Sequence, residues 1–160
     1  AAIAEHISGS QEAFAELMNT EAKQLGATGT HFVNPHGLHD ENHYTTTYDL
    51  YLMFNEALKD QAFLDIISMN SYTAKVTSAD GTSYTPTWQA TNYYSAGEAT
   101  PPDGIHVYGG KTGTTDQAGN CVILYEKNTA GEPYISVIMG TSDKPLLYEE
   151  MNELLDAGMK

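Results

Sequence analysis

The segment Val107-Tyr108-Gly109-Gly110-Lys111-Thr112-Gly113-Thr114-Thr115 places one lysine among glycines and threonines in a short run. It predicts a strand over residues 105–114. Two more strands are expected over residues 120–126 and 133–140, and the connection between them is of hairpin length. Short connections join antiparallel neighbours, so these segments predict a three-stranded antiparallel sheet.

A helix is expected after the sheet, near the end of the chain. Pro145 suits the first turn of a helix because its ring already holds the backbone near the helical φ. Gly158 suits the end of the same helix. The side chains expected to face inward are Leu147, Met151, Leu154 and Leu155.

The first half of the chain is predicted to be helical. Ser10 can cap one helix and Gly26 can end it in the left-handed conformation. A second helix is expected to begin at Thr46-Thr47-Tyr48-Asp49, which has the pattern of a capping box, and a short third helix follows it. The expected apolar stripes are Phe14, Leu17, Met18, Ala22 and Leu25 on the first helix and Leu50, Met53, Phe54, Ala57 and Leu58 on the second.

Two segments between these elements have their own signals. Residues 27–46 form a long polar loop that contains Asn34-Pro35-His36-Gly37-Leu38, and a loop of this length is usually functional or packed against the domain. Residues 71–76 and 83–89 flank Asp80-Gly81, which predicts a hairpin.

Helices first and antiparallel strands last predict an α+β fold, not a parallel βαβ sheet. Residues 93–104 are expected to be an irregular connection. No linker or repeat divides the chain, so residues 1–160 are expected to form one domain. Residues 1–6 are helical in character without a preceding cap, so we expect further sequence upstream of them.

Composition excludes several classes of function. The chain has 160 residues and a net charge of −14, and its seven basic residues are all lysines. Nucleic-acid binding and lipid-facing basic helices both need a basic surface, so neither is expected. No stretch is apolar enough to cross a membrane. Cys121 is the single cysteine, which excludes an internal disulfide, and we expect a buried, inert thiol.

Lys111, Thr112 and Gly113 offer the groups that a carboxylate site needs. Lysine supplies a cation, threonine a hydroxyl donor, and glycine leaves the strand edge open to a bound backbone. The N–H of Thr114 would then point toward a developing oxyanion. On the triplet alone, an exposed strand lysine before a turn is the simpler interpretation.

The residues around the triplet favour a functional site over an exposed strand lysine. Residues 109–121 resemble the Lys-Thr-Gly segment of the serine-type D-alanyl-D-alanine carboxypeptidases, the low-molecular-mass penicillin-binding proteins. Residues 32–38 and 47–50 resemble further segments of that family in the same order. Residues 1–19 are similar to the helix after the family's Ser-Gly-Asn motif, and residues 154–158 are similar to the end of its catalytic domain.

The resemblance implies a partial β-lactamase/transpeptidase-like fold that lacks the N-terminal strands and the nucleophile helix. It implies that Lys111 and Thr112 hold the substrate carboxylate and help to position protons. Gly113 would line the substrate strand, and Thr114 would supply one oxyanion N–H. The implied partners are β-lactams and peptidoglycan stem peptides ending in D-Ala-D-Ala, with no cofactor and no metal. The implied location of the parent protein is extracytoplasmic, at the cell wall or membrane.

The nucleophile of that family is missing from the sequence. No Ser-x-x-Lys occurs in the 160 residues. Ser68-Met69-Asn70 fits Ser-x-Asn in the wrong order, and Ser71 lies four positions before Lys75 in an expected strand. We therefore expect the chain alone to be inactive, while the complete parent would be a hydrolase acting through an acyl-serine.

Two alternatives stay open. The chain could be a non-catalytic module that binds peptides or muropeptides through Lys111 and Thr112. It could also be a relative of the β-lactamases, which share the Lys-Thr-Gly strand. Residues 34–38 and the carboxypeptidase-like C-terminal helix argue against the second alternative.

The loop histidines and the aromatic residues are interpreted as structural residues, not as ligand sites. A zinc site is not expected at the loop histidines, because they lack regular ligand spacing, and His36 is expected to serve loop structure at the rim of the site. Trp88 and the eleven tyrosines could form a sugar-binding platform, but partly buried packing is the commoner use of such residues. The loop histidines are His31, His36, His39 and His43.

The family resemblance also predicts an exposed sheet edge. In the family's strand order, the strand over residues 133–140 would pair on its far side with a strand that this chain lacks. An open apolar edge favours pairing with another chain. We therefore expect either a dimer through this edge or an altered packing of the helices.

Overall fold

Three antiparallel strands form the central sheet of the computed structural model, which describes residues 1–158. They are β5 (His106–Thr115), β6 (Gly119–Lys127) and β7 (Pro133–Thr141), in the order β5-β6-β7. The predicted antiparallel sheet is therefore confirmed, with boundaries within two residues of those expected. Within the described residues, β7 pairs only with β6 and so forms an edge of the sheet.

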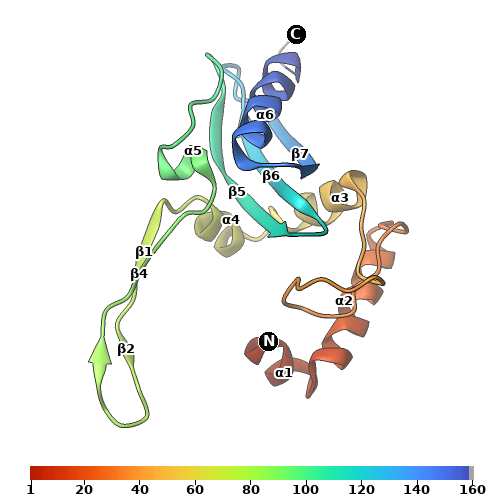
Figure 1. The fold of residues 1–160 in the computed structure, drawn as a ribbon, viewed down its shortest axis with the longest axis vertical. Coiled ribbons are helices and arrows are strands. Elements are labelled where there is room, and N and C mark those ends of the chain that lie inside the picture. Colours follow the sequence, from red (N-terminus) through yellow and green to blue (C-terminus); the bar gives the residue numbers. More distant parts are fainter. Residues whose placement is uncertain (159–160) are drawn as a thin grey trace.

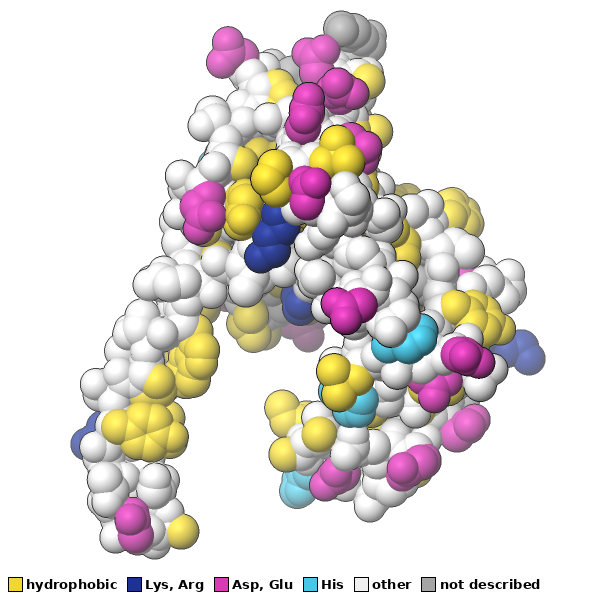
Figure 2. Space-filling model, in the orientation of Figure 1, with side chains coloured by type: hydrophobic (Ala, Val, Ile, Leu, Met, Phe, Trp, Pro, Cys, Tyr) yellow, Lys and Arg dark blue, Asp and Glu magenta, His cyan; other side chains and the backbone are white. Residues whose placement is uncertain are grey.

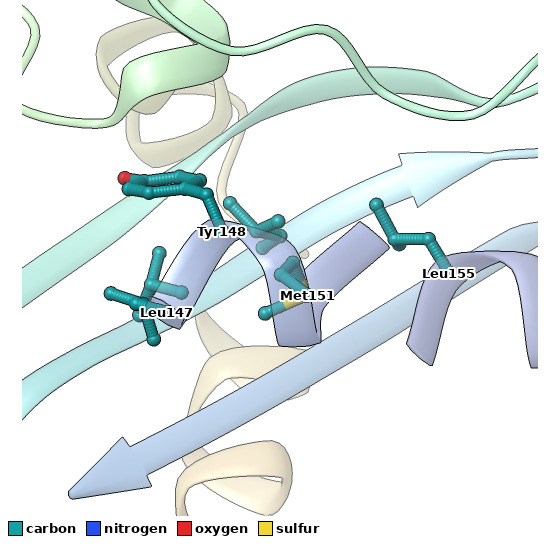
Figure 3. Close-up of a cluster of buried hydrophobic side chains, with 6 residues drawn as sticks. Leu147, Tyr148, Met151 and Leu155 are labelled. Atoms are coloured by element: carbon teal, nitrogen blue, oxygen red, sulfur yellow. The ribbon is translucent and has the colours of Figure 1, made fainter. Parts of the chain in front are cut away.

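The helix α6 (Lys144–Gly158) covers one face of the sheet (Figure 1). Its first turn is capped by Asp143, whose Oδ1 accepts a hydrogen bond from the Leu146 N–H at 2.9 Å. The side chains it directs at the sheet (Figure 3) pack against Val122 and Leu124 of β6. They are Leu147, Tyr148, Met151 and Leu155.

Tyr148 takes the inward position that was expected for Leu154, and that expectation was wrong. Leu154 is 41% exposed, whereas Tyr148 is 5% exposed. The Tyr148 ring stacks on Tyr93 with centroids 4.5 Å apart, and its hydroxyl accepts a hydrogen bond from the Tyr93 N–H at 2.9 Å. The phenol can be buried because its polar end has this partner.

Tyr93 belongs to a short helix, α5 (Tyr93–Ala96), in the region expected to be irregular. Asn92 caps it by accepting a hydrogen bond from the Tyr94 N–H at 3.0 Å, and Gly97 ends it in the left-handed conformation, with φ of 78°. A single helical turn carries too little periodicity to be predicted from apolar spacing.

Glu126 is an ionisable residue inside the packed layer between the sheet and α6. It is 1% exposed, and Ser136 Oγ donates to its Oε1 at 2.6 Å. Its Oε2 has no hydrogen-bond partner in the described structure. Burial raises the pKa of Glu126 to about 7, and the hydrogen bond from Ser136 partly opposes that rise.

The N-terminal helices begin and end close to where they were predicted. They are α1 (Ala2–Ser8), α2 (Gln11–Gln24), α3 (Thr47–Ala57) and α4 (Gln61–Ile67). Ser10 Oγ accepts from the Ala13 N–H at 3.0 Å, and Thr46 Oγ1 accepts from the Asp49 N–H at 3.1 Å. The second half of the capping box does not form, because Asp49 Oδ2 instead accepts a hydrogen bond from Thr30 Oγ1 at 2.6 Å. No helix within residues 1–158 has the length and apolar character needed to span a membrane.

The apolar faces of α2 and α3 line an open groove of about 650 Å³. The residues of α2 that are buried are Ala15 and Ala22, while Leu17 is 51% exposed. The predicted stripes thus lie on the expected faces without being fully covered. The apolar residues that line the groove are Phe14, Leu17, Met18, Ala22, Leu25, Phe32, Met53 and Ala57.

A two-stranded ribbon projects from the rest of the chain between α4 and α5 (Figure 1). At its root β1 (Ser71–Thr73) pairs with β4 (Thr87–Gln89), and toward its tip β2 (Val76–Thr77) pairs with β3 (Ser83–Tyr84). The predicted hairpin around residues 80–81 is confirmed, although each predicted strand is broken into two short ones. Trp88, on β4, is 53% exposed, so the expectation of partly buried packing was wrong for this tryptophan.

Candidate active site

The Lys-Thr-Gly segment lies on β5, which is the other edge of the sheet. In register, Lys111 lies opposite Ile123 and Gly113 lies opposite Cys121. Because β5 pairs only with β6 in the described residues, its second edge can pair with a bound extended backbone. Cys121 is half-buried, not buried as expected, because its partner in the register is a glycine.

The three glycines of the segment have different roles. A Cβ on Gly109 would lie 1.9 Å from the Ile67 carbonyl oxygen at the end of α4, and one on Gly110 would lie 2.1 Å from the Ile123 carbonyl oxygen. Both positions therefore require glycine for packing. A Cβ on Gly113 would meet no atom within 4 Å, so packing does not explain the glycine there.

Lys111 has an exposed side chain on this edge. Its Nζ donates a hydrogen bond to the Thr112 carbonyl oxygen. Within residues 1–158 no carboxylate forms an ion pair with it, although the chain carries 21 acidic residues. An ammonium group without a carboxylate partner can accept an anionic ligand at this position.

The two threonines beside Lys111 are held by different partners. Thr112 Oγ1 lies 2.6 Å from Thr91 Oγ1, and Thr91 follows β4 by two residues. Thr114 Oγ1 donates to Asn120 Oδ1 at 3.2 Å, and the buried Asn120 donates in turn to the Thr141 carbonyl oxygen at 3.3 Å. Thr91 was not expected from the sequence, because the two hydroxyls are 21 positions apart.

A cleft of about 560 Å³ separates this strand from the long loop. One wall is Lys111 to Thr115, and the other includes residues 34–38. Figure 2, in the orientation of Figure 1, shows the molecule hollowed between the projecting ribbon and the N-terminal helices. The two segments that seemed most informative in the sequence therefore meet across one cavity, and His36 lies on its rim as expected.

Two asparagines hold the loop in place. Asn19 on α2 donates from Nδ2 to the Phe32 carbonyl oxygen at 2.8 Å and accepts from the Phe32 N–H at 2.7 Å. Asn34 accepts from the Gly37 N–H at 2.7 Å and donates to the Leu38 carbonyl oxygen at 3.0 Å. Asn19 was missed in the sequence because a lone polar residue on a helix carries no local signal of a distant partner.

Three of the four loop histidines, His31, His36 and His43, act as hydrogen-bonding groups. His43 Nδ1 accepts from the Val33 N–H at 3.2 Å, and its ring meets Phe32 edge-on at 5.5 Å. Burial lowers the pKa of His43; the negative charge of Asp40 opposes this, while His31 and His36 add to it. A neutral ring near pH 7 is the form that can accept this bond.

The cleft offers a cation, hydroxyls and backbone N–H groups, which can bind a carboxylate and polarise a carbonyl. It contains no serine among its lining residues. Within residues 1–158, no group of three histidine, cysteine or acidic side chains is placed to hold a metal ion. The described residues can therefore bind and orient an acyl substrate, but they supply no attacking hydroxyl of the serine-lysine type.

Known proteins are similar to this chain in sequence and in fold. Residues 1–143 match the model of a family described as D-alanyl-D-alanine carboxypeptidase. The D-alanyl-D-alanine carboxypeptidase DacA of Haemophilus influenzae is 31% identical over 159 residues, which cover 98% of this chain and 37% of that protein. DacF of Bacillus subtilis, with the same enzyme name, is 52% identical over 58 residues, which cover 36% of this chain and 15% of that protein.

Solved structures of similar enzymes have the same fold as this chain. The DD-transpeptidase of a Streptomyces strain superposes with a TM-score of 0.82 at 26% identity, over 92% of this chain and 54% of that one. DacD of Francisella tularensis superposes with a TM-score of 0.81 at 25% identity, over 99% of this chain and 48% of that one. The chain thus spans about half the length of these structures, and less of the two curated relatives. With one family covering residues 1–143 and its fold reproduced, the chain belongs to the D-alanyl-D-alanine carboxypeptidase family.

Proposed function

We propose that this chain forms part of the catalytic domain of a D-alanyl-D-alanine carboxypeptidase. The complete enzyme removes the terminal D-alanine from peptidoglycan stem peptides through an acyl-serine. The observation that carries the proposal is the cleft in which Lys111 to Thr115 face residues 34–38. It joins an ammonium group that has no carboxylate partner in the described residues to an open strand edge, and these suit a peptide that ends in a carboxylate.

Each residue of the strand has a proposed role. Lys111 and the Thr112 hydroxyl bind the substrate carboxylate and help to position protons. Gly113 lets the substrate backbone lie against β5, since no packing contact requires glycine there. The Thr114 N–H polarises the scissile carbonyl as one oxyanion donor. β-Lactams bind the same groups because they carry a carboxylate next to a reactive carbonyl.

In this proposal residues 1–160 are one incomplete domain, and the attacking serine with its lysine lies on a part of the domain that they do not include. The chain alone has no such activity, because its sequence lacks Ser-x-x-Lys. The parent protein works outside the cytoplasm, at the cell wall or membrane, where its polymeric substrate is found.

The exposed edge of β7 is the proposed contact for a second chain. Within the described residues its outer edge is unpaired, and Tyr134 and Met139 are each 37% exposed. Strand pairing across this edge would give a dimer. Sedimentation velocity tests this: a dimer that a proline at Val137 converts to monomer supports it, and a concentration-independent monomer excludes it.

A non-catalytic binding module is the second candidate, and the absence of a serine from the cleft lining favours it. Such a module would bind acetyl-D-alanyl-D-alanine without turning it over. The two candidates differ in what a longer chain does, because only a fragment of an enzyme gains activity when the missing motifs are added.

The deciding experiment is intact mass after incubation with benzylpenicillin, on the 160-residue chain and on a chain extended upstream through both missing motifs. We expect an adduct on the longer chain only. An adduct on the shorter chain would show that a nucleophile lies within it and overturn the role assignment. No adduct on the longer chain, with dipeptide binding lost in Lys111→Ala and kept in Lys23→Ala, would establish the binding module instead.

A further inference from the structure

The hydroxyl of Thr112 has one hydrogen-bonding partner in the part of the chain that the structure describes. That partner is Thr91 Oγ1, at 2.6 Å, and Thr91 lies just beyond the root of the projecting ribbon. Thr114, two positions further along β5, is held separately through Asn120. The orientation of the Thr112 hydroxyl therefore depends on a residue that does not belong to its own strand.

The backbone around Thr91 is anchored on both sides. On one side, the Ala90 N–H donates to the Asn70 carbonyl oxygen at 2.8 Å. On the other side, Asn92 is 3% exposed and caps α5. Because these contacts fix the position of Thr91, its hydroxyl is a stable reference point for the side chain of Thr112.

Thr112 lies on the face of the sheet from which Thr91 can reach it. In register it is opposite Val122, which packs in the core under α6 beside the tyrosines of α5. Successive side chains of a strand point to opposite faces, so Lys111 lies on the other face. A carboxylate bound at the edge of β5 can therefore be contacted from both faces, by the ammonium group from one and by the hydroxyl from the other.

Two hydroxyls that bond to each other have one hydrogen left to donate. Each threonine hydroxyl carries a single hydrogen, and the bond between Thr91 and Thr112 uses one of the two. When Thr91 is the donor, Thr112 keeps its own hydrogen for a ligand, and a hydroxyl that already accepts a hydrogen bond donates more strongly. Without this bond the Thr112 hydroxyl would be free to occupy three staggered rotamers.

We propose that Thr91 is a positioning residue of the carboxylate site, which holds the Thr112 hydroxyl in the rotamer that meets the carboxylate of an acyl peptide. Thr91 acts through Thr112 and does not touch the ligand, in keeping with its place outside the residues that line the cleft. The identity of the ligand as a peptide carboxylate rests on the proposed function, whereas the fixed rotamer of Thr112 does not.

The first test measures the rotamer of Thr112 in the chain without a ligand. Three-bond NMR couplings from its methyl carbon to the backbone nitrogen and carbonyl carbon report χ1. We expect one rotamer in wild type and in Thr91→Ser, which keeps the hydroxyl. We expect averaged couplings in Thr91→Val, which keeps the shape and removes the hydroxyl. Averaged couplings in wild type, or a single rotamer in Thr91→Val, would overturn the proposal.

The second test is an NMR titration with acetyl-D-alanyl-D-alanine. Thr91→Val should raise Kd about threefold, which is the factor for selecting one rotamer of three, and Thr91→Ser should keep the wild-type value. The matched control is Thr87→Val, which breaks a similar hydroxyl pair on the ribbon, with Thr73 at 2.7 Å, and should leave Kd unchanged. Circular dichroism establishes that the variants fold. Equal Kd values in wild type and Thr91→Val, or the same increase in Thr87→Val, would refute the positioning role.

A double-mutant cycle separates positioning from direct contact. Thr112→Val should raise Kd by about tenfold or more, and adding Thr91→Val to it should change nothing further. A further increase would mean that Thr91 binds the ligand itself, which contradicts the positioning role. Unchanged dipeptide binding in both Lys111→Ala and Thr112→Val would instead contradict the proposed function, and the rotamer of Thr112 would still decide the role of Thr91.

Discussion

The layer formed by β6 and α6 and the pair formed by α2 and α3 carry similar apolar stripes, but they bury them to different extents. Leu124 and Met151 in the first are both 0% exposed, whereas Leu17 in the second is 51% exposed. The first layer has a facing partner along its length, and the second lines a groove. An apolar stripe therefore specifies which face can be buried, while the degree of burial depends on what packs against it.

Truncations of large side chains should show this difference most strongly. Met151→Ala should lower the free energy of unfolding by about 2–5 kcal/mol, since it leaves a cavity in a closed core. Leu17→Ala should cost less than about 1 kcal/mol, because most of that side chain already contacts solvent. Urea unfolding followed by circular dichroism measures both. Equal losses would mean that the groove is closed in solution and would remove the contrast.

The pH dependence of stability should come from the packed layer. Burial raises the pKa of Glu126 to about 7, so the folded chain keeps a proton that the unfolded chain loses near pH 4.5. Stability should therefore be highest below pH 4.5 and fall as the pH rises through about 7, by up to about 3 kcal/mol. Urea unfolding from pH 4 to pH 8 tests this.

Glu126→Gln is the informative variant, because it keeps the hydrogen-bonding shape without the ionisation. Its stability should lack the decline seen in wild type between about pH 4.5 and pH 7. Glu56→Gln, at the open groove, is the matched control and should keep the wild-type profile. A decline of the same size in Glu126→Gln would assign the pH dependence to other groups.

Substitutions of Gly110 and Gly113, both on β5, should show that the first glycine is needed for packing and the second for ligand binding. Gly110→Ala should destabilise the chain by about 1–3 kcal/mol, because the new Cβ meets the Ile123 backbone. Gly113→Ala should leave the melting temperature nearly unchanged and weaken binding of acetyl-D-alanyl-D-alanine. Thermal unfolding and NMR titration give the two readouts. Unchanged dipeptide binding in Gly113→Ala would remove its proposed role beside the substrate backbone.

The smallest expected effect is at the cap of α2. Ser10→Ala should cost about 1 kcal/mol, because the Ala13 N–H loses its acceptor. The comparison is Thr20→Ala on the same helix, whose hydroxyl donates to the Glu16 carbonyl oxygen without capping an end. Hydrogen exchange in the first turn of α2 should speed up in Ser10→Ala alone. Equal rates in both variants would mean that tertiary contacts, not the cap, hold this turn.

Local chemistry explains which features could be predicted from the sequence. The caps at Ser10 and Thr46 and the hairpin around residues 80–81 depend on neighbouring residues, and all three are found. The strand of Lys111 and the loop of residues 34–38 were both singled out, although their meeting across a cleft is tertiary information.

The features that sequence reasoning missed depend on partners far along the chain. Asn19 bonds to a backbone 13 positions away, and Thr91 bonds to Thr112 across 21 positions. Tyr148 replaced Leu154 in the core because a stacked ring and a backbone N–H made burial of a phenol favourable. None of these partners can be recognised from spacing along one segment.

The hydrogen bond between Thr91 and Thr112 joins the projecting ribbon to the carboxylate cleft. Thr91 follows β4 of the ribbon by two residues, while Thr112 lines the cleft. A displacement at the root of the ribbon would therefore shift the hydroxyl that is proposed to hold the substrate carboxylate, so the ribbon and the cleft should respond to each other mechanically.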